Sequence, residues 1–179
     1  FLGKFMKKQT ICLSMIVKNE ATVIRRCLDS VKHLITHWVI VDTGSTDGTQ
    51  DIIREYMADL PGTLYEREWQ DFAHNRSEAL ALSQPMADYS LVIDADDVLI
   101  TPADFVIPEL AHDAYNLNIL DDPLIYPRVQ LVRNSLPWRY RGVLHEFITC
   151  DQENSTSTIP LAIRRNHDGA RRKEASVFL

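Results

Sequence analysis

Segments with strand character alternate with segments of helical periodicity through the first hundred residues. The strand segments are residues 10–17, 37–42, 63–69 and 89–94, and the helical segments between them are residues 20–35, 47–60 and 71–83. A continuous apolar run such as TICLSMIV (10–17) is typical of a strand covered on both faces, whereas the alternation in TLYEREW (63–69) indicates a strand nearer an edge. Strands that alternate with helices form a mostly parallel sheet flanked by helices. The sequence therefore predicts the α/β class with a Rossmann-like sheet.

The pattern beyond residue 100 is weaker. Residues 124–134, 141–150 and 155–167 are expected to form further strands. Two polar residues stand where helices should begin: Asn19 is expected to cap the helical segment 20–35, and Asp47 to start the next one.

The composition limits the classes of protein to which the chain can belong. Its 179 residues, 45% hydrophobic and 25% charged, suit one soluble domain with a sizeable core. A net charge of −6 without a basic stripe argues against a nucleic-acid partner. Three widely spaced cysteines argue against a disulfide scaffold and favour a reducing, cytoplasmic location. No run of 18 apolar residues occurs, so we expect no transmembrane segment.

The stretch SLVIDADDVLI (90–100) places Asp94, Asp96 and Asp97 directly after a buried strand. Carboxylates this close repel one another and raise each other's pKa unless a cation is present. A hard divalent ion such as Mg²⁺ or Mn²⁺ removes that conflict and can bridge phosphate oxygens. The alternative is a helix cap followed by solvated turn acids. Three aspartates at one strand end favour metal or phosphate chemistry.

Two other strand ends carry polar residues. The first strand leads to Lys18-Asn19-Glu20, and the second ends at Asp42 before a loop rich in Gly, Ser and Thr. In open parallel sheets the carboxyl ends of strands meet at one edge, where ligands bind. The loop VDTGSTDGT matches neither the dinucleotide-binding motif nor the P-loop motif, so it either cradles phosphate or is an ordinary turn. Asp42 could accept hydrogen bonds from a base or a ribose.

Four segments together, LSMIVKNEATVIRRCLDSV, WVIVDTGSTDGT, FAHNRSEAL and LVIDADD, closely resemble the nucleotide-sugar-binding half of family 2 glycosyltransferases in order and spacing. Further along, YRGVLHEF resembles a subgroup with a Gly-x-x-His-Glu element. The resemblance covers residues 9–150 well and continues more weakly to 169. It implies the GT-A fold, with a mixed, mostly parallel sheet.

The resemblance also implies a division of the chain. Residues 9–169 would be the catalytic domain, with a nucleotide-sugar-binding half (9–100) and an acceptor and catalytic half (101–169). Residues 1–8 would be an N-terminal extension or a remnant of expression, and residues 170–179 a C-terminal tail, complete or truncated.

Residue roles follow from the same resemblance. The nucleotide sugar would be bound by Ser14, Ile16, Glu20, Asp42, Asn75, Arg76, Asp94, Ala95 and Asp97. A divalent metal, Mn²⁺ or Mg²⁺, would be held by Asp94, Asp96 and His167, with Asp96 favoured as the direct ligand. Glu146 would be the general base, and His145 is its competitor because an imidazole suits that task at neutral pH. On a regular strand these two neighbours would face opposite ways, so both reach the site only across a turn or bulge.

The expected function is an inverting transfer of a hexose from a UDP-type nucleotide-diphosphate donor, assisted by the metal. The acceptor could be a glycan, a lipid-linked molecule or a protein, and a lipid-linked acceptor would bring the protein to the inner face of the membrane. Trp138 and Tyr140 would be either a sugar platform or packing residues. One alternative is a donor-binding module without catalysis. Another is a nucleotidyltransferase, which the absence of glycine in VKNEAT (17–22) disfavours.

Overall fold

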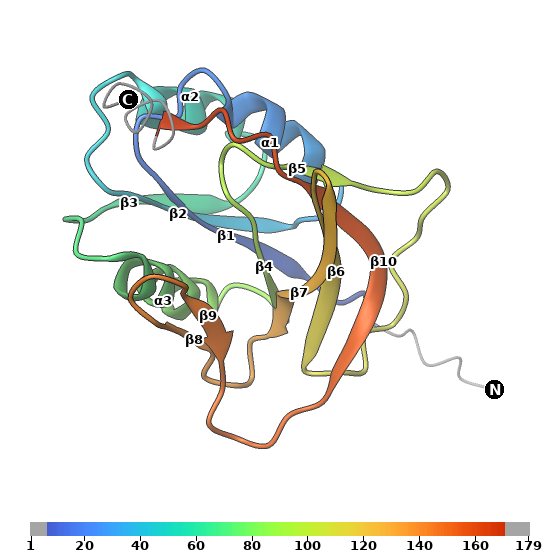
Figure 1. Ribbon diagram of the computed structural model, residues 1–179. Coiled ribbons are helices and arrows are strands. Elements are labelled where there is room, and N and C mark those ends of the chain that lie inside the picture. Colours follow the sequence, from blue (N-terminus) through green and yellow to red (C-terminus); the bar gives the residue numbers. More distant parts are fainter. Residues whose placement is uncertain (1–6, 171–179) are drawn as a thin grey trace.

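The computed structural model describes residues 7–170 (Figure 1). The helices are α1 (Ile24–Val31), α2 (Thr49–Tyr56) and α3 (Phe72–Ser83). The main sheet contains β1 (Ile11–Val17), β2 (His37–Asp42), β3 (Gly62–Glu66), β4 (Tyr89–Val92), β5 (Val98–Ile100), β6 (Ala114–Asp121), β7 (Leu124–Arg133) and β10 (Thr156–Arg164). A small second sheet pairs β8 (Arg139–Arg141) with β9 (Phe147–Thr149).

The main sheet has the strand order β3-β2-β1-β4-β7-β6-β10-β5. Its first four strands are parallel, β7 runs antiparallel to both of its neighbours, and β10 is parallel to β6 but antiparallel to β5. The predicted mixed, mostly parallel α/β sheet flanked by helices is thus confirmed. Because β1, β2 and β4 are parallel and adjacent, the polar residues that follow them lie at one edge of the sheet, as expected.

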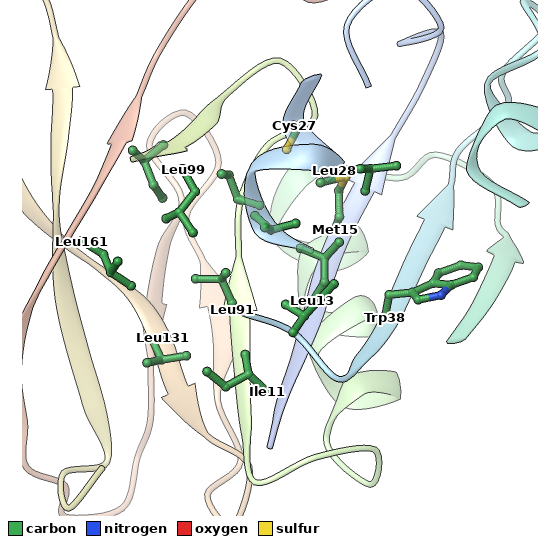
Figure 2. Close-up of a cluster of buried hydrophobic side chains, with 14 of the residues drawn as sticks. Ile11, Leu13, Met15, Cys27, Leu28, Trp38, Leu91, Leu99, Leu131 and Leu161 are labelled. Carbon is green, nitrogen blue, oxygen red and sulfur yellow. The ribbon is translucent and has the colours of Figure 1, made fainter. Parts of the chain in front are cut away.

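A hydrophobic core joins the two halves of the described chain. Leu13 of β1 packs with Leu28 of α1 and Leu91 of β4, and Leu131 and Leu161 extend the same cluster into the second half (Figure 2). In α1 the buried positions are Ile24, Cys27, Leu28 and Val31, the spacing of one helical face. This packing fixes the carboxyl ends of β1 and β4 relative to the later strands. Within the described residues, no helix has the length and apolar character that crossing a membrane requires.

The expected helix caps were partly wrong. Asn19 does not cap α1, because its backbone is left-handed (φ 54°) and its Oδ1 accepts the Thr46 N–H at 2.7 Å. The capping position of α1 is Val23, whose side chain has no acceptor. Asp47 instead ties the turn before α2 by accepting the Thr49 N–H at 3.1 Å.

The predicted strand at 141–150 is confirmed only at its two ends, because a turn interrupts it. The chain leaves β8 at Arg141, turns, and enters β9 only at Phe147. Gly142 permits the turn, since its φ is +109° and a Cβ there would lie 2.6 Å from the His145 carbonyl oxygen. Val143 and Leu144, read from sequence as strand residues, are 91% and 85% exposed.

Candidate functional site

A cavity of about 600 Å³ opens at the carboxyl edge of β1, β2 and β4. Its walls come from the ends of these strands, the first turns of α3 and the segment that follows β10. The predicted site residues that line it are Ile16, Glu20, Arg76, Asp94, Ala95, Asp96 and His167. Residues far apart in the sequence therefore meet in one hollow, at the place where open α/β sheets bind ligands.

The three aspartates after β4 form the acidic cluster, which comprises Asp94, Asp96 and Asp97. One carboxylate oxygen of each lies within 4.8 Å of the others. A tight turn brings them together, because the Asp97 N–H donates to the Asp94 carbonyl at 3.1 Å. Oxygen donors in this number and spacing suit a hard divalent cation, so the residues present fit Mn²⁺ or Mg²⁺.

Within the acidic cluster, the pKa values of Asp97 and Asp94 shift in opposite directions. Burial, together with the charges of Asp94 and Asp96, raises the pKa of Asp97 to about 8. Burial also acts to raise the pKa of Asp94, but the charge and hydrogen bond of Arg76 outweigh it, so that pKa lies below its usual value. The raised pKa of Asp97 reflects in part an excess of negative charge in the acidic cluster, and a bound cation would offset that excess.

Arg76 links the acidic cluster to the expected base. Its Nη2 lies 2.7 Å from Oδ1 of Asp94, and its Nε lies 3.5 Å from Oε1 of Glu146. The guanidinium also lies over two aromatic rings, with its central carbon 5.7 Å from the centroids of Phe72 and of Tyr140. The Arg76 side chain is only 11% exposed, so its position is defined by these contacts.

Glu146 and His145 differ in placement. The Glu146 side chain is 14% exposed and faces Arg76. The His145 side chain is exposed on the turn between β8 and β9. The turn that interrupts the expected strand therefore gives the two candidates different surroundings. Glu146 is the one that contacts Arg76, a residue of the cavity wall.

Four predicted donor residues do not line the cavity but are buried behind it, namely Ser14, Asp42, Asn75 and Asp97. Asn75 secures the loop before α3, where its Oδ1 accepts the Gln70 N–H at 2.9 Å and its Nδ2 donates to the Glu68 carbonyl at 3.1 Å. The structure does not bring Asn75 or Ser14 to the cavity wall.

Asp42 is buried, and only one of its two carboxylate oxygens accepts hydrogen bonds from described residues. Oδ1 accepts the N–H groups of Gly44 and Ser45, both at 2.9 Å, and the Gln50 amide at 3.2 Å. Oδ2 is buried without a hydrogen-bond partner among the described residues. A buried carboxylate oxygen in that state is an acceptor in need of a donor. The next residue, Thr43, lines the cavity.

The segment after β10, residues 166–170, reaches across to the acidic cluster. The Gly169 N–H donates to Oδ2 of Asp96 and the Ala170 N–H to Oε2 of Glu20, both at 3.3 Å. Burial raises the pKa of Glu20 to about 7, although the Ala170 N–H opposes this. His167 lines the cavity, but its Nε2 lies 2.5 Å from Oδ1 of Asp121 and, within residues 7–170, it is not part of the acidic cluster.

Several cavity residues were missed by sequence reasoning. Trp69 and Phe72 line the cavity with their rings edge to face, 4.6 Å apart between centroids, and Arg165 lines it from the end of β10. Trp69 could have been found, because it is an aromatic residue at the carboxyl end of the predicted strand 63–69, on the ligand edge. Tyr140 is buried in a second hydrophobic cluster and Trp138 is partly buried against it, which favours packing for these two.

Comparison with known sequences places the chain in a family. Residues 12–107, more than half of the chain, match Glycosyl transferase family 2. A TPR repeat-containing protein of Synechococcus elongatus is 40% identical over 58% of this chain and 24% of its own length. The glycosyltransferase SunS of Bacillus subtilis is 34% identical over 50% of this chain and 20% of its own. The lipopolysaccharide core biosynthesis glycosyltransferase LpsC of Rhizobium meliloti is 32% identical over 54% and 35%. The matched region is thus about a third or less of each relative.

Solved structures share the fold. TarS of S. aureus, in complex with UDP-GlcNAc, superposes with a TM-score of 0.59 at 14% identity, over 84% of this chain and 58% of that one. The mannosyltransferase PcManGT of Pyrobaculum calidifontis, in complex with GDP-Man and Mn²⁺, gives a TM-score of 0.51 at 19% identity, over 72% and 45%. The sheet order, the cavity at its carboxyl edge and the family match agree: the chain belongs to glycosyl transferase family 2 and has the GT-A fold.

Proposed function

We propose that this protein transfers a hexose from a UDP-type nucleotide-diphosphate donor to an acceptor hydroxyl or other nucleophile, with inversion at the sugar carbon. The observation that carries the proposal is the cavity lined by Asp94, Asp96 and Arg76, in which Arg76 joins the acidic cluster to Glu146 just behind the cavity wall. Two proteins with the same fold support it, since TarS was solved with UDP-GlcNAc and PcManGT with GDP-Man and Mn²⁺.

The donor would lie along the carboxyl edge of β1 and β2. The unpartnered Oδ2 of Asp42 would accept a hydrogen bond from the nucleoside, and Ile16 and Glu20 would line the same end of the cavity. Ala95 offers a small side chain beside the acidic cluster, where the diphosphate and sugar would come close to the backbone. Ser14 and Asn75 would support this site from below rather than contact the donor.

Asp94 and Asp96, with His167 as a further candidate, would hold Mn²⁺ or Mg²⁺. When bound, the cation would stabilise the negative charge that develops on the leaving diphosphate. Arg76 pairs with the Asp94 carboxylate and lies near that of Glu146. Asp97 would contact the sugar or the acceptor from behind the cluster.

Glu146 would take the proton of the attacking group, because it is the carboxylate that faces the Arg76 side of the cavity. One base suffices for a single inverting displacement. The acceptor would be a glycan, a lipid-linked molecule or a protein. The proposed location is the cytoplasm, and a lipid-linked acceptor would bring the protein to the inner face of the membrane. The three cysteines are free thiols, which agrees with that location.

Calorimetric titration of the purified chain with UDP, and with GDP as a control, each with and without Mn²⁺, tests the proposal. We expect UDP to bind more tightly than GDP and to require Mn²⁺, and Asp96→Ala to remove the metal dependence. Asp113→Asn is the matched control, because Asp113 is a comparably buried acid that pairs with Arg133 outside the cavity. If neither nucleotide binds under any condition, the donor-site proposal is wrong.

A further inference from the structure

At the cavity wall His167 pairs with Asp121, a residue to which the proposed function assigns no role. Oδ1 of Asp121 lies 2.5 Å from Nε2 of His167. Asp121 is the last residue of β6, and His167 follows the end of β10 and lines the cavity. A carboxylate held against an imidazole at a ligand site controls which ring nitrogen carries the proton.

The parallel pairing of β6 with β10 creates this contact. Arg164 pairs with Leu120, and the Arg165 N–H then donates to the Leu120 carbonyl at 3.0 Å, so the chain leaves β10 beside Asp121. Nη1 of Arg165 lies 3.9 Å from the second oxygen of Asp121. The carboxylate is therefore held between a cation and the imidazole, and its orientation is defined.

The backbone at His167 is unusual. Its φ of +58° lies in the left-handed region, which residues with a side chain occupy sparsely. On either side of it the chain is attached to Asp96: Asn166 donates its amide to the Asp96 carbonyl at 3.3 Å, and the Gly169 N–H donates to Asp96 Oδ2 at the same distance. Such conformations persist where the surroundings over-determine them, and they concentrate at functional sites. Here they tie the segment that carries His167 to Asp96 of the acidic cluster.

We propose that Asp121 is a positioning residue for the metal site. By accepting the Nε2–H of His167, it fixes the neutral tautomer whose Nδ1 keeps a lone pair, and that nitrogen is the ligand offered to the divalent cation of Asp94 and Asp96. A carboxylate behind a histidine ligand fixes the ring orientation and strengthens the nitrogen as a donor. This inference rests on the metal-dependent function proposed above.

Mn²⁺ binding in the presence of UDP tests the inference without an assay of transfer. Removal of such an outer carboxylate weakens metal affinity by roughly 10–100-fold, so we expect Asp121→Ala to weaken Mn²⁺ binding by that factor in calorimetry. Pulsed EPR of the bound Mn²⁺ should show a histidine nitrogen coupling in the native chain. That coupling should disappear in His167→Ala and diminish in Asp121→Ala. Asp121→Asn keeps an acceptor oxygen, so we expect an intermediate loss, and it serves as the variant of choice if the alanine form fails to fold.

Asp113→Asn is the matched control. Asp113 stands just before the other end of β6, its side chain is 25% exposed against 24% for Asp121, and it too pairs with an arginine. We expect native Mn²⁺ affinity and coupling in this variant. Native Mn²⁺ binding in folded Asp121 variants, or an unchanged coupling in His167→Ala, would overturn the inference. If Asp96→Ala still bound Mn²⁺ weakly in that case, the proposed metal site would remain supported. An Asp96→Ala variant that binds Mn²⁺ normally would overturn both.

Discussion

The guanidinium of Arg76 lies 2.7 Å from the carboxylate of Asp94, which joins helix α3 to the acidic cluster at the end of β4. The same guanidinium faces Glu146 from the other half of the chain. Arg76 therefore connects the residues proposed to hold the cation with the residue proposed to remove the proton, and much of the behaviour of the site should depend on it.

Arg76→Met should destabilise the metal-free protein. Removing one partner of a buried pair costs about 3–5 kcal/mol, and since Asp94 is about one-third exposed we expect about 2 kcal/mol here. The double variant Arg76→Met/Asp94→Asn should recover part of the loss, with a coupling energy of about 1 kcal/mol in urea denaturation. Added Mn²⁺ should also restore stability to the single variant. Strictly additive effects would show that the two side chains do not interact.

Stability should fall as pH rises from about 5 to 8 in the absence of metal. The folded-state pKa of Asp97 is raised to about 8, above its unfolded value, so the native state binds more protons in this window. Stability from such a group is present below its unfolded pKa and is lost as the pH rises toward the folded pKa. The raised pKa of Glu20, about 7, acts in the same direction.

Asp97→Asn separates this effect from other titrations. We expect the variant to lose most of the pH-dependent decline, a difference on the order of a few kcal/mol at pH 8 measured by chemical denaturation. Native protein with Mn²⁺ should show a smaller decline, because the cation stabilises the ionised cluster. Equal slopes of stability against pH for the native and variant proteins would contradict the prediction.

Asp42→Asn should impair donor binding without unfolding the protein. The amide oxygen can replace Oδ1 as acceptor for the Gly44 and Ser45 N–H groups, but the amide nitrogen would then occupy the place of the unpartnered Oδ2. A donor nitrogen cannot accept a hydrogen bond from a nucleoside, so UDP affinity should fall roughly tenfold or more. Calorimetry measures the affinity and a thermal melt checks the fold. Native UDP affinity in the variant would remove Asp42 from the donor site.

Gly169→Ala should disturb the metal site while the fold persists. A Cβ at this position would lie 2.7 Å from Oδ2 of Asp96 and 3.0 Å from Oε1 of Glu20. Because these atoms belong to side chains, they can move, but the Asp96 carboxylate then leaves its place in the acidic cluster. We expect about tenfold weaker Mn²⁺ binding in the presence of UDP, with a change in stability of about 1 kcal/mol or less. UDP binding measured without metal provides the internal control.

Glu146→Gln should bind the donor normally and transfer poorly. The amide retains the size of the carboxylate but cannot accept a proton, and loss of a general base lowers rates roughly 10²–10⁴-fold. Donor affinity and turnover are measured on the same preparation, with His145→Gln beside it. A native rate for Glu146→Gln together with a slow His145→Gln would transfer the role of base to the histidine.

The sequence predicted those parts of the site that neighbouring residues determine. Asp94, Asp96 and Asp97 follow a buried strand within four residues, so one turn is enough to bring their carboxylates together. The alternation of strands and helices up to residue 94 likewise implied a parallel sheet, and with it a shared edge for Glu20 and the acidic cluster. These relationships depend on short-range periodicity, which a single sequence displays directly.

Only the tertiary structure decided what depends on contacts between distant segments. The turn at Gly142 gives Glu146 and His145 different surroundings, and alternation alone could not show it. The contact of Asp121 with His167 requires β6, whose AYNLNILD sequence was not recognised as a strand, to pair with β10. Asn75 proved to be a buried support of its loop, because burial is a property of the packed core and not of the local pattern. The sequence by itself determined the sheet and its acidic edge, while long-range packing decided which side chains face one another across the cavity.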